Sequence, residues 1–548
     1  MFWFLFAIFL LPPPAVAGEP DVIDSIVQHL IVLRAERAAL EDQVEHLAAE
    51  NQMLRDELAD QDDALPSYRF FAGRHLQLTV PDLLELDPGE AAGLNPQWDF
   101  GENTAFAQVS GFAAGHVYDT PGQYTVTLDG EPFAKVEVLA SRAPEQAESW
   151  EQVAQYVAAR KPVMLPAGVV EVSQTLNLPE KAVLVGHPDG STIKWVGGKH
   201  GVIFNAYAGG ILVRNLTFDS RYTEPDKAAP DAIRLGGTGS AILDNTFLHI
   251  GTAINGNGQP TNTLVQGNTA PLDAGLKAYF IWGEGGPWAI YGNTVVNSTR
   301  EHGIRVGGPK GSAGGNIVCV VGNTIGNLDR RDVTDNPDPF DFTKAALKFQ
   351  KGQYGWAEGN TFTGPWTVGP LGEGDGLGDK EGRWNVAVFR NNRGTSRFEV
   401  EHGSNHVHIE GNDIAVDDDT AMELNGWDER YGRGSSDVVV QGNTLRNGGE
   451  IGRGVHVQSR IEGLTVRGNT YAAPKLVQGG YNSGGFLSEV DPGENWTIEG
   501  NTWPAASPRA WPRGIVNRMN KDWLTISQWQ ALPVTRDEHV AIVQPEGE

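Results

Sequence analysis

Cysteine is almost absent from this sequence: its 548 residues contain one, Cys319. A single thiol excludes an intramolecular disulfide framework and a zinc cluster built on cysteines. Basic residues are also scarce, because 42 Lys and Arg stand against 69 Asp and Glu and give a net charge of −27. A protein that binds the phosphate backbone of nucleic acids needs a basic face, so we expect no nucleic-acid partner.

Long apolar runs are missing after the first residues, and the one at the N-terminus is too short to span a bilayer as a helix. Residues 2–11 are all apolar, prolines occupy 12–14, and Ala15-Val16-Ala17 has the small-x-small spacing that signal peptidase accepts. We therefore predict a cleaved signal peptide at 1–17 and a secreted, cell-surface or periplasmic protein. No Lys or Arg precedes the apolar run, which leaves a retained membrane anchor as the alternative.

Residues 21–65 carry a heptad repeat of apolar residues. The first seam contains Ile26, Leu33, Leu40, Leu47 and Leu54. The second seam contains Ile23, Leu30, Val44 and Leu58, interrupted by Arg37 and Asn51. This pattern predicts an α-helical coiled coil that joins two or three copies of the chain, and a buried Asn in such a seam favours a parallel dimer. The alternative is one amphipathic helix packed on its own domain.

From residue 67 to 140 the pattern changes to short alternating strands. The segment contains Trp98-Asp99-Phe100-Gly101-Glu102, Gly115-His116-Val117-Tyr118 and Pro121-Gly122-Gln123-Tyr124-Thr125-Val126. These motifs resemble a PKD domain, which implies an immunoglobulin-like β-sandwich, although the family motif ends in Gly-Asp where this chain has Gly-Glu. The Pro121-Gly122 pair is expected to make a hairpin turn, with Tyr124, Val126 and Leu128 alternating into the core. Such modules are usually spacers or weak binders in secreted proteins.

Glycine is abundant at 68 residues, above the usual share of about 7%, and shows no Gly-X-Y period. A short apolar strand ending in Asn, often as Gly-Asn-Thr, recurs at intervals of 20 to 37 residues. These positions are Asn215, Asn245, Asn268, Asn293, Asn323, Asn360, Asn392, Asn412, Asn443, Asn469 and Asn501. Repeats of this length predict a solenoid of stacked coils. Asn tolerates the left-handed backbone at a bend and can bond the equivalent Asn of the next coil, so we interpret the column as structural.

A short helix is predicted at 147–160, where Trp150, Val153 and Val157 recur at helical spacing before Leu165-Pro166-Ala167-Gly168. This order resembles the opening of pectate-lyase-like right-handed parallel β-helices of secreted bacterial proteins, in which the helix caps the first coil. The resemblance implies a β-helix over 145–505. Residues 523–530 resemble the C-terminal segment of many such proteins, so 506–548 is predicted as a cap or tail.

The predicted fold class is therefore mainly β. A right-handed parallel β-helix (solenoid) follows an immunoglobulin-like PKD β-sandwich and an N-terminal α-helical coiled coil. Cys319, in the apolar strand 317–321, is expected to point into the β-helix as a buried inert thiol. Scaffolds of this family host pectate and alginate lyases, polygalacturonase-like hydrolases, epimerases, phage spikes and adhesins, so the fold does not give the function.

Each coil has a second strand some 10 to 20 residues before its Asn strand. The apolar residues of that strand alternate inward, so the residues between them face outward and stack at about 4.8 Å per coil. The first outward column is predicted to contain Arg234, Asn255, Arg305, Lys348, Glu399, Glu423 and His456. The second contains Gln350, Glu401, Asn425 and Gln458, with His402 directly after Glu401. Charged and amide side chains that converge on one sheet face are typical of a sugar-binding groove, which predicts an extracellular polysaccharide as the partner.

Three interpretations of this ladder are open. In a lyase, Lys348 or His302 would abstract the proton α to a uronate carboxylate that Arg305 neutralises. In a hydrolase, Glu399 and Glu423 would lie about 5 Å apart on adjacent coils, where like-charge repulsion raises one pKa and the separation suits a retaining mechanism. In a non-catalytic adhesin or structural protein, the ladder would bind glycan without turnover. Alternatively its charges would only neutralise one another, as with Lys348 beside Glu399.

Two further segments are predicted to border the groove. The Gly-rich stretch 364–383 is long for a turn, and Trp366 and Trp384 near its ends could stack on sugars; the alternative is a plain insertion. Asp417-Asp418-Asp419, followed by Glu423, offers oxygen ligands for Ca²⁺ without EF-hand spacing, and an exposed acidic turn is the alternative. No cofactor is certain from the sequence.

Overall fold

The computed structural model describes residues 65–222, 229–271, 276, 278–296, 302–307, 317–326, 345–350, 354–368, 386–401, 403–417, 419–426, 434–449, 452–473, 484–488, 495–505, 535–536 and 539–542. The predicted signal peptide and all but the last residue of the predicted coiled coil lie outside the described residues, as do His402, Trp384, Asp418 and most of the predicted tail. Within the described part, no helix has the length and apolar character needed to cross a membrane.

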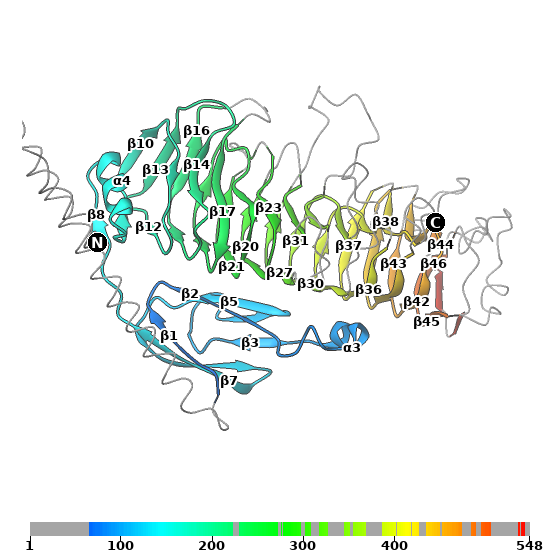
Figure 1. Ribbon diagram of the computed structural model, residues 1–548. Coiled ribbons are helices and arrows are strands. Elements are labelled where there is room, and N and C mark those ends of the chain that lie inside the picture. The colour runs from blue at the N-terminus through cyan, green and yellow to red at the C-terminus, as the bar shows by residue number, and fades with distance from the viewer. Residues whose placement is uncertain are drawn as a thin grey trace, which may run out of the picture. The chain divides into compact units, whose positions relative to one another are not determined.

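From residue 145 onward the chain winds through three long parallel sheets (Figure 1). Consecutive strands enter different sheets, and each strand generally pairs with the strand three places later in the chain. The chain therefore forms a parallel β-helix, as predicted. Crossovers between parallel strands are right-handed in about 98% of cases, which is the winding sense predicted from the sequence.

We name the sheets by what lies on their outer faces. The ladder sheet consists of β11 (Leu176–Asn177), β14 (Val202–Ala206), β17 (Asp231–Thr238), β20 (Ile254–Thr261), β23 (Ile281–Glu284), β26 (Ile304–Gly307), β29 (Leu347–Phe349), β32 (Trp366–Val368), β35 (Phe398–Val400), β38 (Thr420–Leu424), β41 (Arg453–Val457) and β44 (Gly484–Ser488).

The docking sheet consists of β8 (Glu145–Gln146), β9 (Val163–Met164), β12 (Val183–Val185), β15 (Leu212–Arg214), β18 (Ala241–Leu243), β21 (Thr263–Gln266), β24 (Trp288–Tyr291), β27 (Ile317–Val321), β30 (Tyr354–Glu358), β33 (Val386–Arg390), β36 (Asn405–Glu410), β39 (Ser436–Gln441), β42 (Glu462–Arg467), β45 (Trp496–Glu499) and β47 (Thr535–Arg536). The third sheet consists of β10 (Gly168–Val172), β13 (Ser191–Trp195), β16 (Thr217–Ser220), β19 (Thr246–Phe247), β22 (Thr269–Ala270), β25 (Thr294–Val295), β28 (Thr324–Ile325), β31 (Thr361–Phe362), β34 (Arg393–Gly394), β37 (Asp413–Val416), β40 (Thr444–Asn447), β43 (Thr470–Ala472), β46 (Thr502–Ala505) and β48 (His539–Ile542).

The first coil is covered by the predicted helix, observed as α4 (Trp150–Ala158). Ser149 caps its N-terminus by accepting a bond from the backbone N–H of Gln152 at 3.3 Å. The ring of Trp150 is parallel to that of Phe204, with centroids 6.3 Å apart. The helix thus covers apolar side chains at the start of the stack, where no further coil could cover them.

The predicted asparagine column is present and runs unbroken from Asn245 to Asn501. Each side-chain Nδ2 donates to the Oδ1 of the next coil's asparagine at 2.8–3.0 Å. Two details of the prediction are wrong. Asn215 lies one position out of register, since Leu216 occupies the column and donates its N–H to Asn245. The left-handed residue of each bend is usually the glycine before the asparagine, such as Gly292 with φ +57°, because glycine takes this conformation without a Cβ penalty.

Residues 65–140 form antiparallel β-structure. One sheet has the strand order β1 (Ser67–Phe71), β7 (Glu131–Leu139), β6 (Gly122–Leu128), β3 (Gln97–Asp99) and β4 (Gln108–Ser110). A second sheet pairs β2 (His75–Thr79) with β5 (Ala113–Val117), and α3 (Pro88–Gly93) is the short helix of this region. We call residues 65–140 the N-terminal β-domain; its membership of the PKD family stays a prediction.

The hairpin of the N-terminal β-domain differs from the prediction. Pro121 directly precedes β6 and Gly122 begins it, after a link between strands of different sheets. The turn that joins the paired strands β6 and β7 is Asp129-Gly130, with φ values of +55° and +85°. Two consecutive left-handed residues are the requirement of the type I′ hairpin turn, and the Asp-Gly pair meets it.

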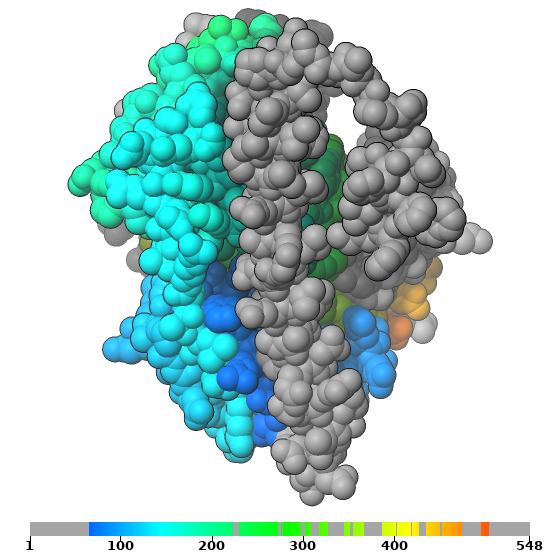
Figure 2. Space-filling view, turned by 60° about the vertical axis from the view of Figure 1, so that its left-hand side comes forward, coloured from blue at the N-terminus to red at the C-terminus, as the bar shows by residue number. Residues whose placement is uncertain are grey.

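The N-terminal β-domain packs on the outer face of the docking sheet, where the two share one apolar cluster. Figure 2 shows the blue start of the described chain adjoining the cyan surface. The Phe112 ring lies 5.2 Å from that of Trp356 in an edge-on contact. The backbone N–H of Ala113 donates to Cys319 Sγ at 3.2 Å. The prediction that Cys319 is a buried thiol is confirmed, but the predicted direction is wrong: the side chain points outward and is buried by the N-terminal β-domain. Burial there raises its pKa to about 12.

Candidate functional site: the outward ladder

The outer face of the ladder sheet carries the predicted column in a single continuous register. The order of Cα partners is Arg234, Asn255, Trp282, Arg305, Lys348, Thr367, Glu399, Glu423, His456 and Leu487. The sequence prediction missed the rungs Trp282 and Thr367. Each follows a buried residue, Ile281 or Trp366, and alternation along a strand is the signal that could have found them.

Trp366 was predicted to stack on sugars, and the structure places it elsewhere. Its side chain is fully buried at 0% exposure. It lies inside the β-helix with its ring 4.9 Å from that of Phe398. The residue begins the short strand β32, and in the register of the sheet Thr367 stands between Lys348 and Glu399. The predicted adjacency of this lysine and glutamate is therefore also wrong.

The centre of the site is a group of three carboxylates, Glu399, Glu401 and Glu423. Glu399 and Glu423 are register partners on β35 and β38. Arg397 Nη1 donates to Glu423 Oε2 at 2.8 Å, whereas its nearest approach to Glu399 is 4.0 Å. Asn425 Nδ2 donates to Glu399 Oε1 at 3.1 Å. Glu423 therefore has a close counter-ion, and Glu399 is held mainly by an amide.

The surroundings of Glu399 strongly perturb its carboxyl group. Its side chain is 16% exposed. Burial is the largest cause that raises its pKa from 4.5 to about 7, followed by the negative charges of Glu401 and Glu423. The positive charges of Arg397 and Lys348 act in the opposite direction. At neutral pH a large share of Glu399 is therefore protonated, which is the state that a general acid requires.

Beyond Thr367, the rungs Lys348 and Arg305 are basic and engaged in polar contacts. Lys348 Nζ forms an ion pair with Glu401 at 2.7 Å, and the lysine side chain is 10% exposed. Arg305 Nε donates to the side-chain oxygen of Gln350, and its Nη1 donates to the Tyr279 hydroxyl at 3.2 Å. The sequence prediction did not include Tyr279, which precedes its strand in the coil.

Aromatic and imidazole groups lie near these basic rungs. The Tyr279 ring stacks near Trp282, with centroids 5.9 Å apart and planes inclined by 24°. His302 is buried, and its Nδ1 accepts from the backbone N–H of Ala345 at 2.6 Å. This bond fixes the orientation of the imidazole at the entry to β26.

The two ends of the ladder are held by their own coils. Arg234 pairs with Asp231 at 3.0 Å, and Asn255 donates to the same carboxylate at 2.8 Å. At the other end, Arg453 Nη1 donates to His456 Nδ1 at 2.6 Å. Burial, with the charges of Arg453 and Arg397, lowers the pKa of His456 to about 3. His456 is therefore a neutral imidazole at physiological pH.

The Ca²⁺ prediction has no support in the described residues, where no group of three or more His, Cys, Asp or Glu side chains is placed to hold a metal ion. Glu423, the fourth residue of that prediction, is bonded to Arg397 and Gln458 in the ladder. Asp419 Oδ1 accepts from the N–H of Thr420 at 2.7 Å. Asp418 lies outside the described residues.

No protein-family model matches the chain, and no curated protein matches it. Solved structures with a similar arrangement include the A-module of the mannuronan C-5 epimerase AlgE6 from Azotobacter vinelandii, at 15% identity and a TM-score of 0.41, over 72% of this chain and 94% of that one. Another is the tailspike of E. coli bacteriophage HK620 in complex with a pentasaccharide, at 11% identity and a TM-score of 0.31, over 73% and 76%. A third is the catalytic domain of a GH87 α-1,3-glucanase in complex with tetrasaccharides, at 12% identity and a TM-score of 0.28, over 86% and 80%.

By its own geometry, the chain is a parallel β-helix protein with a charged ladder on one outer face and an N-terminal β-domain docked on another.

Proposed function

We propose that this protein is a secreted polysaccharide-binding protein and that its ladder hydrolyses glycosidic bonds. The observation that carries the proposal is the difference between two adjacent carboxyl groups. Glu399 is partly buried with a pKa of about 7, and Glu423 has the Arg397 guanidinium at 2.8 Å. Two carboxyl groups whose environments differ in this way are suited to act as acid and nucleophile.

In the proposed reaction Glu399 donates its proton to the oxygen of the leaving sugar while Glu423 attacks the anomeric carbon. A water then enters and gives a proton to Glu399 while its oxygen attacks the anomeric carbon. The bond from that carbon to Glu423 breaks, which releases the sugar as a hemiacetal and restores the Glu423 carboxylate and the protonated Glu399. Adjacent rungs stand about 4.8 Å apart, close to the separation of about 5–5.5 Å between the carboxyl groups of retaining enzymes. The neighbouring rungs Arg305, Lys348 and His456 would line the groove on either side and bind sugar hydroxyls.

A second candidate reaction is β-elimination on a uronate. It is favoured by the basic rungs Arg305 and Lys348, which are register partners, and by the Tyr279 hydroxyl beside Arg305. In such a reaction the arginine would neutralise the carboxylate and a nearby base would take the α-proton. The ion pair between Lys348 and Glu401 counts against Lys348 as that base, because its ammonium group must first lose a proton.

Products distinguish the candidates. The purified full-length protein is incubated with neutral and with acidic polysaccharides. New reducing ends without double bonds support hydrolysis, and unsaturated ends that absorb in the ultraviolet support elimination. Retention on a polysaccharide without products in any reaction would overturn the catalytic proposal and leave a glycan-binding adhesin.

A further inference from the structure

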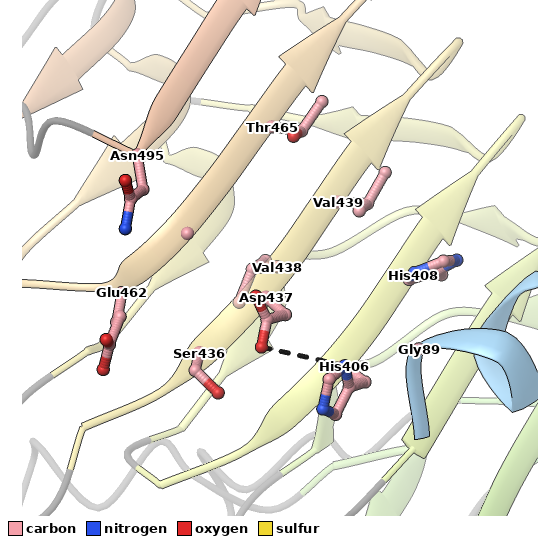
Figure 3. Close-up of a pocket in the computed structure, with 11 residues that line it drawn as sticks. Gly89, His406, His408, Ser436, Asp437, Val438, Val439, Glu462, Thr465 and Asn495 are labelled. Carbon is pink, nitrogen blue, oxygen red and sulfur yellow. Dashed lines mark ion pairs between the residues drawn. The ribbon is translucent and has the colours of Figure 1, made fainter. Parts of the chain in front are cut away.

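A second concave surface lies on the docking sheet, just beyond the part covered by the N-terminal β-domain (Figure 3). It has a volume of about 720 Å³ and crosses β36, β39, β42 and the entry to β45. We call it the histidine groove. Its polar lining includes His406, His408, Ser436, Asp437, Glu462 and Asn495. Ligand pockets commonly have volumes of about 300–1,000 Å³, so the groove is large enough for a small ligand.

The groove arises where one outward column of the docking sheet loses its cover. Trp356 and Val388 in this column are fully buried against the N-terminal β-domain. The next partners in register are His408, Val439 and Thr465, all of them partly exposed. Figure 3 shows these three side chains in a row across the strands. They form a floor that is part apolar and part imidazole.

One wall of the groove is α3 of the N-terminal β-domain. A Cβ placed on Gly89 would stand 3.8 Å from His406 Nδ1, so the helix backbone lies against this imidazole. His406 is also paired with Asp437 at 3.7 Å. The N-terminal β-domain therefore supplies one wall of the groove through Gly89, and strands of the docking sheet supply the rest.

The backbone below the rim is left-handed at the same position of three successive coils. His406, Asp437 and Gly463 have φ values of +45°, +53° and +73°, and they stack in register between regular pairs. A Cβ at Gly463 would stand 2.8 Å from Asp437 Oδ1. The glycine thus leaves the space beside Asp437 open, and non-glycine residues in this conformation cost of order 1–3 kcal/mol each.

We propose that the histidine groove is a second carbohydrate-binding site and that it takes neutral hexose or N-acetylhexosamine units. A pyranose ring has an apolar C–H face and a rim of hydroxyl groups. The floor of Val439 and the imidazoles matches that face, while Ser436, Asp437 and Asn495 offer hydrogen bonds at the rim. The histidine groove and the ladder lie on different sheets, so sugar binding in the groove does not depend on catalysis by the ladder.

The charge of the lining decides between neutral and acidic sugars. Asp437 and Glu462 are both exposed at the groove, and Glu410 lies beside His408 at 3.7 Å. The described lining contains no Lys or Arg. Glu410 is paired with Arg390 at 2.9 Å, so the charge at the groove is that of the exposed Asp437 and Glu462. These two carboxylates would repel a uronate or sulfated sugar but not a neutral one.

The test uses the full-length chain with Glu399→Gln, so that bound sugar is not consumed. Calorimetric titrations with cellohexaose, laminarihexaose, mannohexaose and chitohexaose are compared for this protein and for the same protein carrying Thr465→Trp. Thr465 is outward and half-exposed on the groove floor, so an indole there fills the groove without entering the core. We expect Thr465→Trp to raise the Kd of one binding event by about tenfold or more, or to abolish that event. A tenfold change in Kd corresponds to about 1.4 kcal/mol.

The matched control is Thr470→Trp, because Thr470 is an exposed threonine of the third sheet. It should leave every titration unchanged. Binding that is equal in the Thr465→Trp and Thr470→Trp proteins would overturn the proposal, as would the absence of binding to all of these sugars. Oligogalacturonate is titrated in the same way, and preferential binding of it that Thr465→Trp removes would overturn the neutral specificity. Hydrolysis assays on the Thr465→Trp protein with Glu399 intact test the ladder separately, because Thr465 lies outside the ladder.

Discussion

Glu399 and Glu423 are register partners on adjacent strands of the ladder sheet, yet Arg397 lies 2.8 Å from the carboxylate of Glu423 and 4.0 Å from that of Glu399. This asymmetry divides two chemically identical groups into different roles. The amide of Asn425 is the hydrogen-bond donor on Glu399, so the group can hold a proton without losing an ion pair. Substitutions of Glu399 and Glu423 therefore give the most direct tests of the proposed hydrolysis.

Removing the proton donor should abolish most of the activity. Glu399→Gln keeps the shape and the bond from Asn425 but cannot supply a proton, so we expect kcat to fall by about 10²–10⁴. Glu171→Gln, at an exposed position of the third sheet, is the matched control and should retain full activity. Circular dichroism checks that both proteins are folded. Full activity of Glu399→Gln would remove this residue from the mechanism.

The proposed nucleophile predicts the stereochemistry of the product. With Glu423 attacking the anomeric carbon, the first product should have the same anomeric configuration as the substrate. Proton NMR of the fresh hydrolysate measures it before mutarotation. Glu423→Gly should be inactive, and azide should restore bond cleavage by entering the space and forming a glycosyl azide. A first product with inverted anomeric configuration would show that Glu423 activates a water molecule instead of attacking the sugar.

The raised pKa of Glu399 predicts two pH effects with definite signs. As a general acid, Glu399 must be protonated, so kcat/KM should fall as pH rises through about 7. For stability, the folded chain keeps a proton that the unfolded chain has lost between pH 4.5 and about 7. Stability attributable to this group therefore decreases as pH rises through that window.

The stability effect has its own measurement. Thermal unfolding of Glu399→Gln should show a gain in Tm over the unmodified protein above about pH 7, and that gain should shrink toward pH 4.5. A difference in Tm that is the same at all pH values would show that the carboxyl group keeps its ordinary pKa in the folded chain.

The repeat made the β-helix predictable, and the site was predictable to the extent that it follows the repeat. Arg305, Glu399 and Glu423 were placed in one column because alternation in a strand fixes which side chains face outward. Trp366 was misplaced because it adjoins a long Gly-rich stretch, and sequence alone did not show that a three-residue strand begins there. Missing that strand also hid the rung at Thr367.

Long-range packing was not visible in the sequence. The strand around Cys319 is apolar on both faces, and both faces are buried: one by the coil interior and the other by the N-terminal β-domain. A strand buried on both sides reads as a continuous apolar run, so the pattern could not tell inward from outward. The histidine groove depends on the same docking, and no local motif around His406 or His408 indicated it.

The asparagine column predicts a large and local stability effect. Asn323 accepts from the backbone N–H of Asn293 at 2.9 Å and donates to the carbonyl of Ile290 at 2.9 Å, and all of these bonds are buried. Asn323→Ala leaves buried partners unsatisfied, each at a cost of about 1–3 kcal/mol. The control is Asn215→Gly, because Asn215 is exposed, outside the column and left-handed at φ +57°. In denaturant unfolding, Asn323→Ala should have a lower midpoint than Asn215→Gly. Equal midpoints for the two proteins would show that the asparagine column does not contribute to stability.

Docking of the N-terminal β-domain predicts a coupling between Phe112 and the reactivity of Cys319. Phe112 is fully buried, and its ring lies 5.2 Å from that of Trp356 and 5.8 Å from that of Tyr354. Phe112→Ala should cost about 3–5 kcal/mol of unfolding free energy and should expose the thiol, so that a disulfide reagent labels Cys319 faster than in the unmodified protein. Phe71→Ala is the control, because that ring is 42% exposed, and its labelling rate should not change. If Phe112→Ala lowers stability but leaves Cys319 as slow to react as before, the thiol is buried by something other than this contact.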